Sequence, residues 1–131
     1  MDGVNQYKIF LVDDDSFLLN MYVAKFKKAG HEVETAKSGL EALKKLQDGY
    51  TPDVMLMDIV LPGMDGVELL RQIRKEKLAE KTMFVMFTNQ GGEEETSEAK
   101  RLGVTDYLIK ADLVPSGIVD KVLKIIENNR S

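Results

Sequence analysis

Polar side chains that could do chemistry follow four of the five short apolar runs in this chain. They are Asp13, Asp14 and Asp15 after the first run, Asp58 after the third, Thr88 after the fourth and Lys110 after the fifth. The carboxyl ends of parallel strands meet at one edge of a sheet, where such sheets bind their ligands, so we expect these side chains to lie together. Three carboxylates, a hydroxyl and an ammonium group would then converge on one rim.

The residue types at this rim indicate a particular chemistry. Carboxylates held close together repel one another unless a cation lies between them. Magnesium meets this need, because it takes oxygen ligands from one or two carboxylates, keeps several waters and accepts a phosphate oxygen. The Lys110 ammonium could bind the same phosphate, and the Thr88 hydroxyl could donate a hydrogen bond to it. The set therefore predicts a magnesium-dependent phosphoryl site.

The apolar runs themselves predict strands. They are Lys8–Val12, His31–Thr35, Val54–Met57, Met83–Phe87 and Tyr107–Ile109. The first, third and fourth are almost continuously apolar, which is typical of central parallel strands buried on both faces. The second alternates polar and apolar residues, which favours an edge strand.

Segments with helical periodicity separate these runs. The expected helices cover Phe17–Phe26, Gly39–Gln47, Gly66–Lys75, residues 93–102 and Ser116–Asn128. Ser38 and Asp65 are the expected N-caps of the second and third helices. In the second helix Leu40, Leu43 and Leu46 are three residues apart and predict one buried face.

The alternation of strands and helices predicts the α/β class. We expect a doubly wound five-stranded parallel sheet, (βα)5, with helices on both faces. Right-handed crossovers leave few topologies, and the expected strand order is 2-1-3-4-5. The length of 131 residues suits one domain, so residues 1–131 are expected to form a single domain.

The composition excludes several classes of protein. The chain has no cysteine, which excludes disulfide scaffolds, thiolate metal sites and cysteine nucleophiles. Its 18 basic and 22 acidic residues give a net charge of −4, which argues against direct binding to nucleic acid. No apolar run approaches the ~18 residues of a membrane span, and the first residues lack the form of a signal peptide. We therefore expect a cytoplasmic location without membrane insertion.

Four motifs together resemble the receiver domain of the response regulators of two-component systems. They are Leu11–Asp15, Met57–Gly66, Phe87–Thr88 and Tyr107–Lys110. The resemblance covers residues 7–128, and the motif around Asp58 is the most specific of the four. From the end of the chain after the fifth helix we expect a stand-alone receiver of the chemotaxis type.

The resemblance implies a role for the residues of the rim. Asp58 would be the phospho-acceptor and would take its phosphoryl group from the phosphohistidine of a sensor histidine kinase or a phosphotransfer protein. Thr88 and Lys110 would bind the phosphoryl oxygens. Tyr107 would be the switch aromatic that turns inward when Thr88 moves.

The cofactor that the resemblance implies is Mg²⁺. Asp14 and Asp58 would bind it directly, together with the backbone carbonyl of Val60, and Asp13 would act mainly through a water. The resemblance also implies a signalling domain rather than an enzyme, present as a monomer or weak dimer. Its downstream protein target would bind the surface formed by the fourth helix, the fifth strand and the fifth helix.

Residues beside the rim carry further expectations. The lysine is followed by Ala111 where the family usually has proline, and the threonine is followed by Asn89 where the family usually has a small residue. The bulk of Asn89 is expected to hinder the inward turn of the switch aromatic. Val60 and Gln90 are expected to flank the path of a hydrolytic water. His31, the only histidine, is interpreted as a loop residue without a part in ligand binding or phosphotransfer.

Three other functions stay open on the sequence. A haloacid-dehalogenase-like phosphatase also has an aspartate pair after its first strand, matched here by Asp13 and Asp15, and the first of the pair would be its nucleophile. That function leaves the motif around Asp58 unexplained. A flavodoxin-like FMN binder shares the strand order, but residues 13–16 lack the loop rich in Ser, Thr and Gly that would hold a phosphate. The third alternative is a receiver that acts only as an unphosphorylated scaffold.

Overall fold

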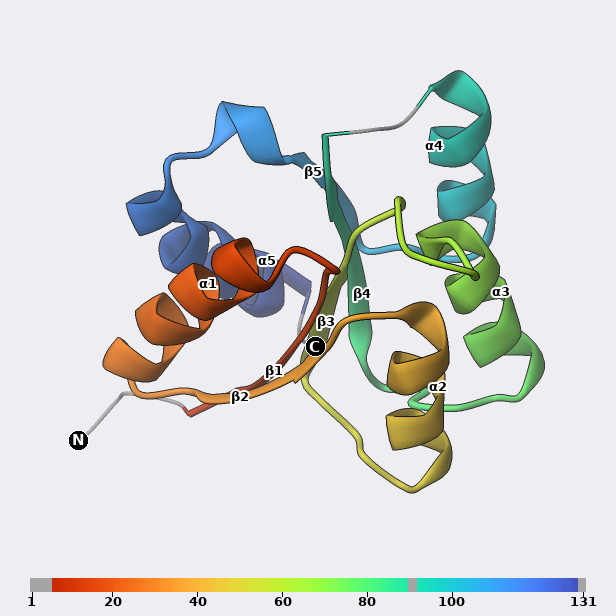
Figure 1. The fold of residues 1–131 in the computed structure, drawn as a ribbon, viewed down its shortest axis with the longest axis horizontal. Coiled ribbons are helices and arrows are strands. Elements are labelled where there is room, and N and C mark those ends of the chain that lie inside the picture. The colour runs from red at the N-terminus through yellow and green to blue at the C-terminus, as the bar shows by residue number, and fades with distance from the viewer. Residues whose placement is uncertain (1–5, 90–91, 130–131) are drawn as a thin grey trace.

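A computed structural model of the chain describes residues 6–89 and 92–129, in which strands and helices alternate (Figure 1). The strands are β1 (Lys8–Val12), β2 (Glu32–Ala36), β3 (Val54–Met57), β4 (Met83–Thr88) and β5 (Asp106–Ile109). The helices are α1 (Ser16–Lys28), α2 (Gly39–Gln47), α3 (Gly66–Lys75), α4 (Glu93–Arg101) and α5 (Ile118–Asn129). Two short 3₁₀ helices, η1 (Lys110–Asp112) and η2 (Pro115–Gly117), connect β5 to α5.

The strands form one parallel sheet in the order β2-β1-β3-β4-β5. This confirms the prediction of a doubly wound, flavodoxin-like α/β fold, including its strand order. The chain passes from the edge strand β2 across β1 to β3, so β1 and β3 are neighbours inside the sheet. The carboxyl ends of β1, β3, β4 and β5 therefore lie side by side.

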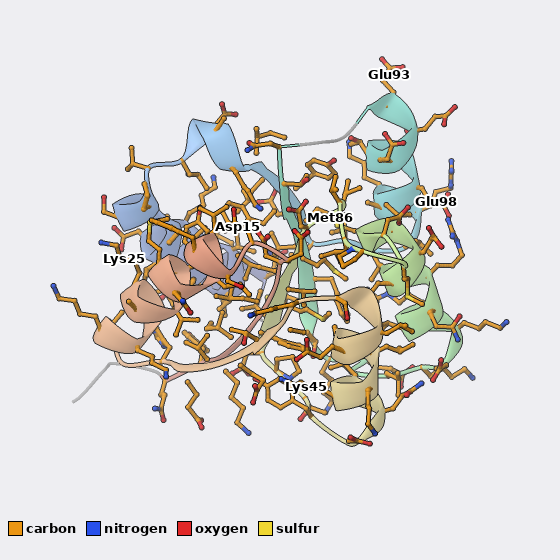
Figure 2. The ribbon with its side chains drawn as sticks, in the orientation of Figure 1. Asp15, Lys25, Lys45, Met86, Glu93 and Glu98 are labelled. Atoms are coloured by element: carbon orange, nitrogen blue, oxygen red, sulfur yellow. The ribbon has the colours of Figure 1, made fainter. Side chains whose placement is uncertain are left out.

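Alternate side chains of the central strands enter two separate cores. Figure 1 shows α1 and α5 on one side of the sheet and α2, α3 and α4 on the other. The core under α2, α3 and α4 receives Phe10, Val12, Met55, Met57, Phe84 and Met86. The core under α1 and α5 receives Ile9, Leu11, Val54, Leu56, Val85 and Phe87. Figure 2 shows Met86 in the interior and Lys25 and Glu93 at the periphery, as burial of apolar surface requires.

The helices begin at the caps that the sequence predicts. Ser38 Oγ accepts a hydrogen bond from the backbone N–H of Glu41 at 3.1 Å, and Asp65 Oδ1 accepts one from Glu68 at 2.8 Å. Each bond satisfies a backbone donor that has no partner within the first turn of its helix. The Asp65 cap fixes the start of α3, the helix that follows the loop after β3.

Four helices end in the same backbone pattern, which requires a left-handed residue after the cap. The residues in this position are Gly30, Gly49, Lys77 and Gly103, with φ of +95°, +106°, +57° and +85°. After α3, the N–H of Lys77 donates to Arg74 at 3.1 Å and that of Leu78 donates to Ile73 at 3.1 Å. This is the Schellman arrangement, in which glycine is the residue without a steric cost. Lys77 is the one non-glycine residue among these four, so its Cβ bears the steric cost of the left-handed conformation.

Leu40 differs from its sequence-based interpretation, and His31 has surroundings that the sequence did not indicate. Leu40 is 65% exposed, because the buried stripe of α2 is formed by Gly39, Ala42, Leu43 and Leu46 and Leu40 lies about 100° around the helix from Gly39. His31 lies in the loop before β2 but is buried, and its Nδ1 accepts a hydrogen bond from the N–H of Tyr7 at 3.1 Å.

Candidate functional site

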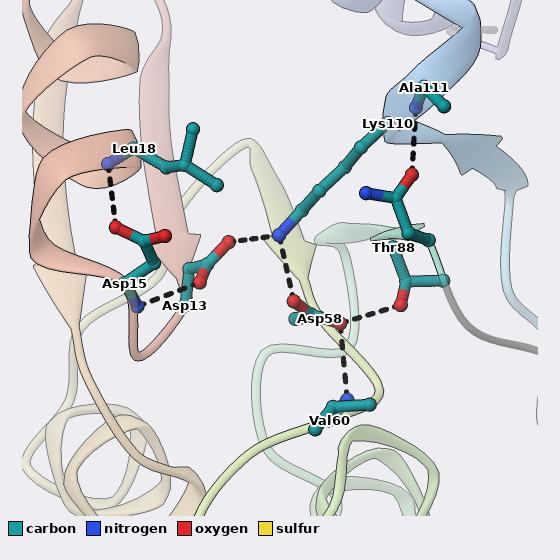
Figure 3. A network of polar contacts seen from close by, with 9 residues as sticks. Asp13, Asp15, Leu18, Asp58, Val60, Thr88, Lys110 and Ala111 are labelled. Carbon is teal, nitrogen blue, oxygen red and sulfur yellow. Dashed lines mark hydrogen bonds and ion pairs between the residues drawn. The ribbon is translucent and has the colours of Figure 1, made fainter.

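The predicted rim residues lie together at the carboxyl edge of the sheet, and Figure 3 shows five of them, Asp13, Asp15, Asp58, Thr88 and Lys110. They line a pocket of about 230 Å³ formed by Asp13, Asp14, Asp15, Leu18, Asp58, Val60, Thr88, Asn89 and Lys110. Each side chain is placed by the strand that ends there, and Thr88 is itself the last residue of β4. The larger pockets of the described residues lie elsewhere and contain none of the rim side chains that follow β1, β3 and β5.

The carboxylate of Asp58 is held by donors on both of its oxygens. Its Oδ1 accepts from the Thr88 hydroxyl at 2.6 Å and from the backbone N–H of Val60 at 3.1 Å. Its Oδ2 accepts from Lys110 Nζ at 2.8 Å. Asp58 is buried, so these hydrogen bonds replace the water that a carboxylate otherwise needs. The side chain is therefore oriented before any ligand arrives.

Lys110 joins two buried carboxylates. Its ammonium donates to Asp13 Oδ2 as well as to Asp58, and its side chain is only 8% exposed (Figure 3). Burial alone would lower the pKa of Lys110, but the hydrogen bonds and negative charges of Asp13 and Asp58 outweigh burial and raise it above its ordinary value. Lys110 is thus a fixed positive charge at neutral pH.

The three aspartates after β1 have different environments. Asp13 is buried, and its Oδ1 accepts a hydrogen bond from the N–H of Asp15 at 2.9 Å. Asp15 Oδ1 caps α1 by accepting from Leu18 at 3.1 Å. Asp14 is exposed at the edge of the pocket. Only Asp13 of the three shares a cation with Asp58 among the contacts that the structure describes.

The donor set at the pocket fits a hard cation. Within residues 6–89 and 92–129, no three acidic or histidine side chains are grouped closely enough to hold a metal ion as they stand. The pocket nevertheless presents the carboxylates of Asp13, Asp14 and Asp58 beside the backbone of Val60. Carboxylate and carbonyl oxygens are the ligands that Mg²⁺ takes, usually from one or two side chains with the rest water. These residues are chemically suited to Mg²⁺.

Gly66, which sequence reasoning treated only as the start of a helix, supports the backbone of Asp58. Its N–H donates to Ile59 at 2.8 Å, and a Cβ at this position would lie 2.2 Å from the carbonyl oxygen of Asp58. Only glycine permits α3 to approach the loop after β3 this closely. A glycine in the first turn of a helix, where it brings no helix propensity, was the signal available in the sequence.

Two of the remaining singled-out residues, Val60 and Asn89, line the pocket. Tyr107 packs against the core under α2, α3 and α4, near Thr96 of α4, and burial raises its pKa. Val60 is 53% exposed at the mouth of the pocket. Asn89 Oδ1 accepts from the N–H of Ala111 at 2.8 Å. Gln90 lies outside the described residues.

The fold and the site together define a class of protein. It is an α/β domain with an acidic pocket and a lysine at the carboxyl edge of its sheet. The chain matches the response regulator receiver domain over residues 9–122, and it belongs to this family of two-component systems. Receiver domains are generally signalling domains rather than enzymes, and the family implies a histidine kinase as partner.

Individual relatives agree with this assignment. Chemotaxis protein CheY1 of Helicobacter pylori is 28% identical over 123 residues, which cover 93% of this chain and 98% of that protein. Transcriptional regulatory protein ResD of Bacillus subtilis is 33% identical over 111 residues, which cover 84% of this chain but 44% of ResD. A CheY-like receiver domain of Methanospirillum hungatei has a TM-score of 0.84 at 27% identity, over 95% of this chain and 96% of that chain. The chain thus spans less than half of ResD and nearly all of CheY1.

Among the described residues, none of the helices is both long and apolar enough to cross a membrane.

Proposed function

We propose that residues 1–131 act as a single receiver domain that takes a phosphoryl group onto Asp58. The donor is the phosphohistidine of a sensor histidine kinase or of a phosphotransfer protein. The observation that carries the proposal is the arrangement of Asp58, whose two oxygens are held by Thr88, Val60 and Lys110 at the end of a central strand. Membership of the receiver family and the similarity to CheY1 support the same function.

The transfer is a displacement at phosphorus. One oxygen of Asp58 forms a bond to phosphorus while the bond from phosphorus to the histidine nitrogen breaks, and the electron pair of that bond returns to the imidazole. A carboxylate attacks a phosphoryl group poorly because both are negative, so catalysis consists of positioning and charge neutralisation. Lys110 already donates to Asp58 at 2.8 Å and supplies positive charge where the phosphoryl oxygens arrive. Thr88 supplies a hydroxyl donor on the other side of the carboxylate at 2.6 Å.

The cation belongs to the same proposal. Asp13, Asp14 and Asp58, with the backbone carbonyl of Val60, are the residues that would hold Mg²⁺. When bound, Mg²⁺ neutralises charge on the phosphoryl oxygens. Asp13 and Asp58 also hold the Lys110 ammonium, so the orientation of Lys110 and the cation site depend on the same two carboxylates.

The signal leaves the site through Thr88 and Tyr107. An acyl phosphate adds about 1.5 to 2 negative charges, which draw the Thr88 hydroxyl away from Asp58 and toward the new oxygens. Tyr107 lies on the neighbouring strand and packs against the core that includes Ala99 of α4, so a turn of its ring would change the contact between β5 and α4. The downstream protein target would then bind the α4–β5–α5 surface, which we define as the outward side chains of these three elements.

The test is phosphorylation by a small donor. The purified protein is incubated with acetyl phosphate and Mg²⁺, its intact mass is measured, and borohydride reduction followed by peptide mapping locates the acyl phosphate. We expect one phosphoryl group on Asp58 and none in Asp58→Asn. The matched control is Asp13→Asn, because the phosphatase alternative places the covalent group on Asp13. A modified Asp13, or an unmodified wild-type protein as in the scaffold alternative, would contradict the proposal.

A further inference from the structure

The two positions at which the sequence departs from the usual receiver pattern contact each other. The backbone N–H of Ala111 donates to Asn89 Oδ1 at 2.8 Å (Figure 3). Proline, the usual residue after the lysine, has no N–H to donate. A small residue, usual after the threonine, has no side-chain oxygen that could reach across to the next loop. The hydrogen bond therefore requires both departures at once.

This hydrogen bond lies directly beyond the paired ends of β4 and β5. Thr88 is in register with Ile109 in the ladder, so Asn89 and Lys110 are the next residues along each strand. The bond joins the residue after Thr88 to the residue after Lys110, and these two side chains hold the Asp58 carboxylate. Asn89 itself lines the pocket. A side chain thus continues the connection between the two strands where the backbone ladder ends.

We propose that Asn89 is a positioning residue that fixes the backbone after Lys110 to the backbone after Thr88, so that both donors to Asp58 move as one unit. This inference rests on the proposed function. Lys110 is the first residue of the short helix η1, and its carbonyl accepts a hydrogen bond from the N–H of Leu113 at 3.2 Å. Without Asn89 the ammonium would spend less time between Asp13 and Asp58, and transfer to Asp58 would be slower.

The expected effect is that of one neutral hydrogen bond near the surface. We expect the rate constant for phosphorylation to fall about fivefold when the bond is lost, which corresponds to ~1 kcal/mol. The bond is exposed, and Asn89 is outside both cores, so the variants are expected to fold. Urea unfolding of each variant verifies this.

The experiment measures Asn89→Ala in two matched backgrounds. Ala111→Gly keeps the backbone N–H, whereas Ala111→Pro removes it. The rate of phosphorylation by acetyl phosphate at fixed Mg²⁺ is expected to fall about fivefold on Asn89→Ala in the glycine background and less than about twofold in the proline background, because the donor is already absent there. Equal effects in the two backgrounds, or no effect in the glycine background, would overturn the proposal.

A second measurement reports the bond without any phosphoryl transfer. Hydrogen exchange of the Ala111 amide, followed by NMR without metal or donor, is expected to be faster in Asn89→Ala and protected in Asn89→Asp, which keeps an acceptor oxygen. An Ala111 amide that exchanges equally in wild type and Asn89→Ala would also overturn the proposal. A wild-type protein that takes up no phosphoryl group would instead overturn the proposed function, and this inference with it. The amide exchange separates these two failures.

Discussion

Replacement of Lys110 by methionine should destabilise the fold more than any other change at the pocket. The side chains of Lys110, Asp13 and Asp58 are 8%, 9% and 11% exposed, so removal of the ammonium leaves two carboxylates together with little water. Loss of one partner from a buried ion pair costs about 3–5 kcal/mol. Methionine keeps most of the length and apolar contact of the lysine stem, so the loss is electrostatic. We expect Lys110→Met to lower the free energy of unfolding by ~3 kcal/mol at neutral pH.

The assay is urea unfolding in buffer with EDTA, followed by circular dichroism because the chain contains no tryptophan. The control is the double variant Lys110→Met with Asp58→Asn. Asparagine removes one of the two unpaired charges, and the double variant should regain at least half of the lost free energy. Addition of Mg²⁺ should stabilise Lys110→Met more than the wild type, because a bound cation replaces the missing positive charge.

The pH dependence follows from the raised pKa of Lys110. Its folded-state pKa lies above the ordinary value of 10.5, so the contribution of the ammonium is complete below that pH and is lost as the pH rises through the folded-state pKa. The difference between wild type and Lys110→Met should therefore stay constant from about pH 7 to 9. A variant within ~1 kcal/mol of the wild type in EDTA would refute the electrostatic reasoning.

Three other predictions test single features. Lys77→Gly should raise the free energy of unfolding by ~0.5–1 kcal/mol, because Lys77 has a φ of +57°. Gly49→Ala should lower it by a similar amount, because Gly49 has a φ of +106° and the added Cβ would meet no atom within 4 Å, so only backbone strain acts. Urea unfolding of both variants checks the pair. Burial lowers the pKa of His31 below its ordinary value of 6.5, so its contribution is present above that pH and is lost as the pH falls toward the folded-state pKa. His31→Asn, which keeps an acceptor for Tyr7 but does not titrate, should lose less stability than the wild type between about pH 7.5 and 5.5; an equal loss in both proteins would exclude His31 as the cause. Val60→Asn should speed decay of the phosphorylated protein about fivefold once the donor is removed, since an amide can orient the attacking water through a hydrogen bond of ~1 kcal/mol; unchanged decay would show that Val60 does not shield the phosphorus.

The fold and the location of the site could be predicted because both are encoded locally. Continuous apolar runs mark buried parallel strands, and the polar residue that ends each run is at the edge where parallel strands meet. The strand order then brings Asp58, Thr88 and Lys110 to one place without knowledge of any distance. The same reasoning predicted the caps Ser38 and Asp65, which depend only on neighbouring residues.

The surroundings of each aspartate after β1 could not be predicted. The resemblance gives Asp14 a direct and Asp13 an indirect part in metal binding, but the sequence does not say that the turn after β1 buries Asp13 and exposes Asp14 while Asp15 caps α1. Which of them meets Lys110 depends on side-chain directions set by packing between distant segments. The burial of His31 could not be predicted for the same reason, since its partner Tyr7 is 24 residues away.

The two cores differ in the types of side chain that fill them. The core under α2, α3 and α4 contains the buried methionines Met55, Met57 and Met86, whereas the core under α1 and α5 contains no buried methionine among the described residues and is rich in isoleucine and valine. Methionine has a flexible, unbranched side chain that adapts to changes in its surroundings, and β-branched residues are stiff. The molecule should therefore be compliant on one side of its sheet and rigid on the other. Methyl relaxation in NMR would show this as greater disorder of the three methionine methyls, and it would mean that α4 can shift while α1 and α5 keep the acidic pocket in place.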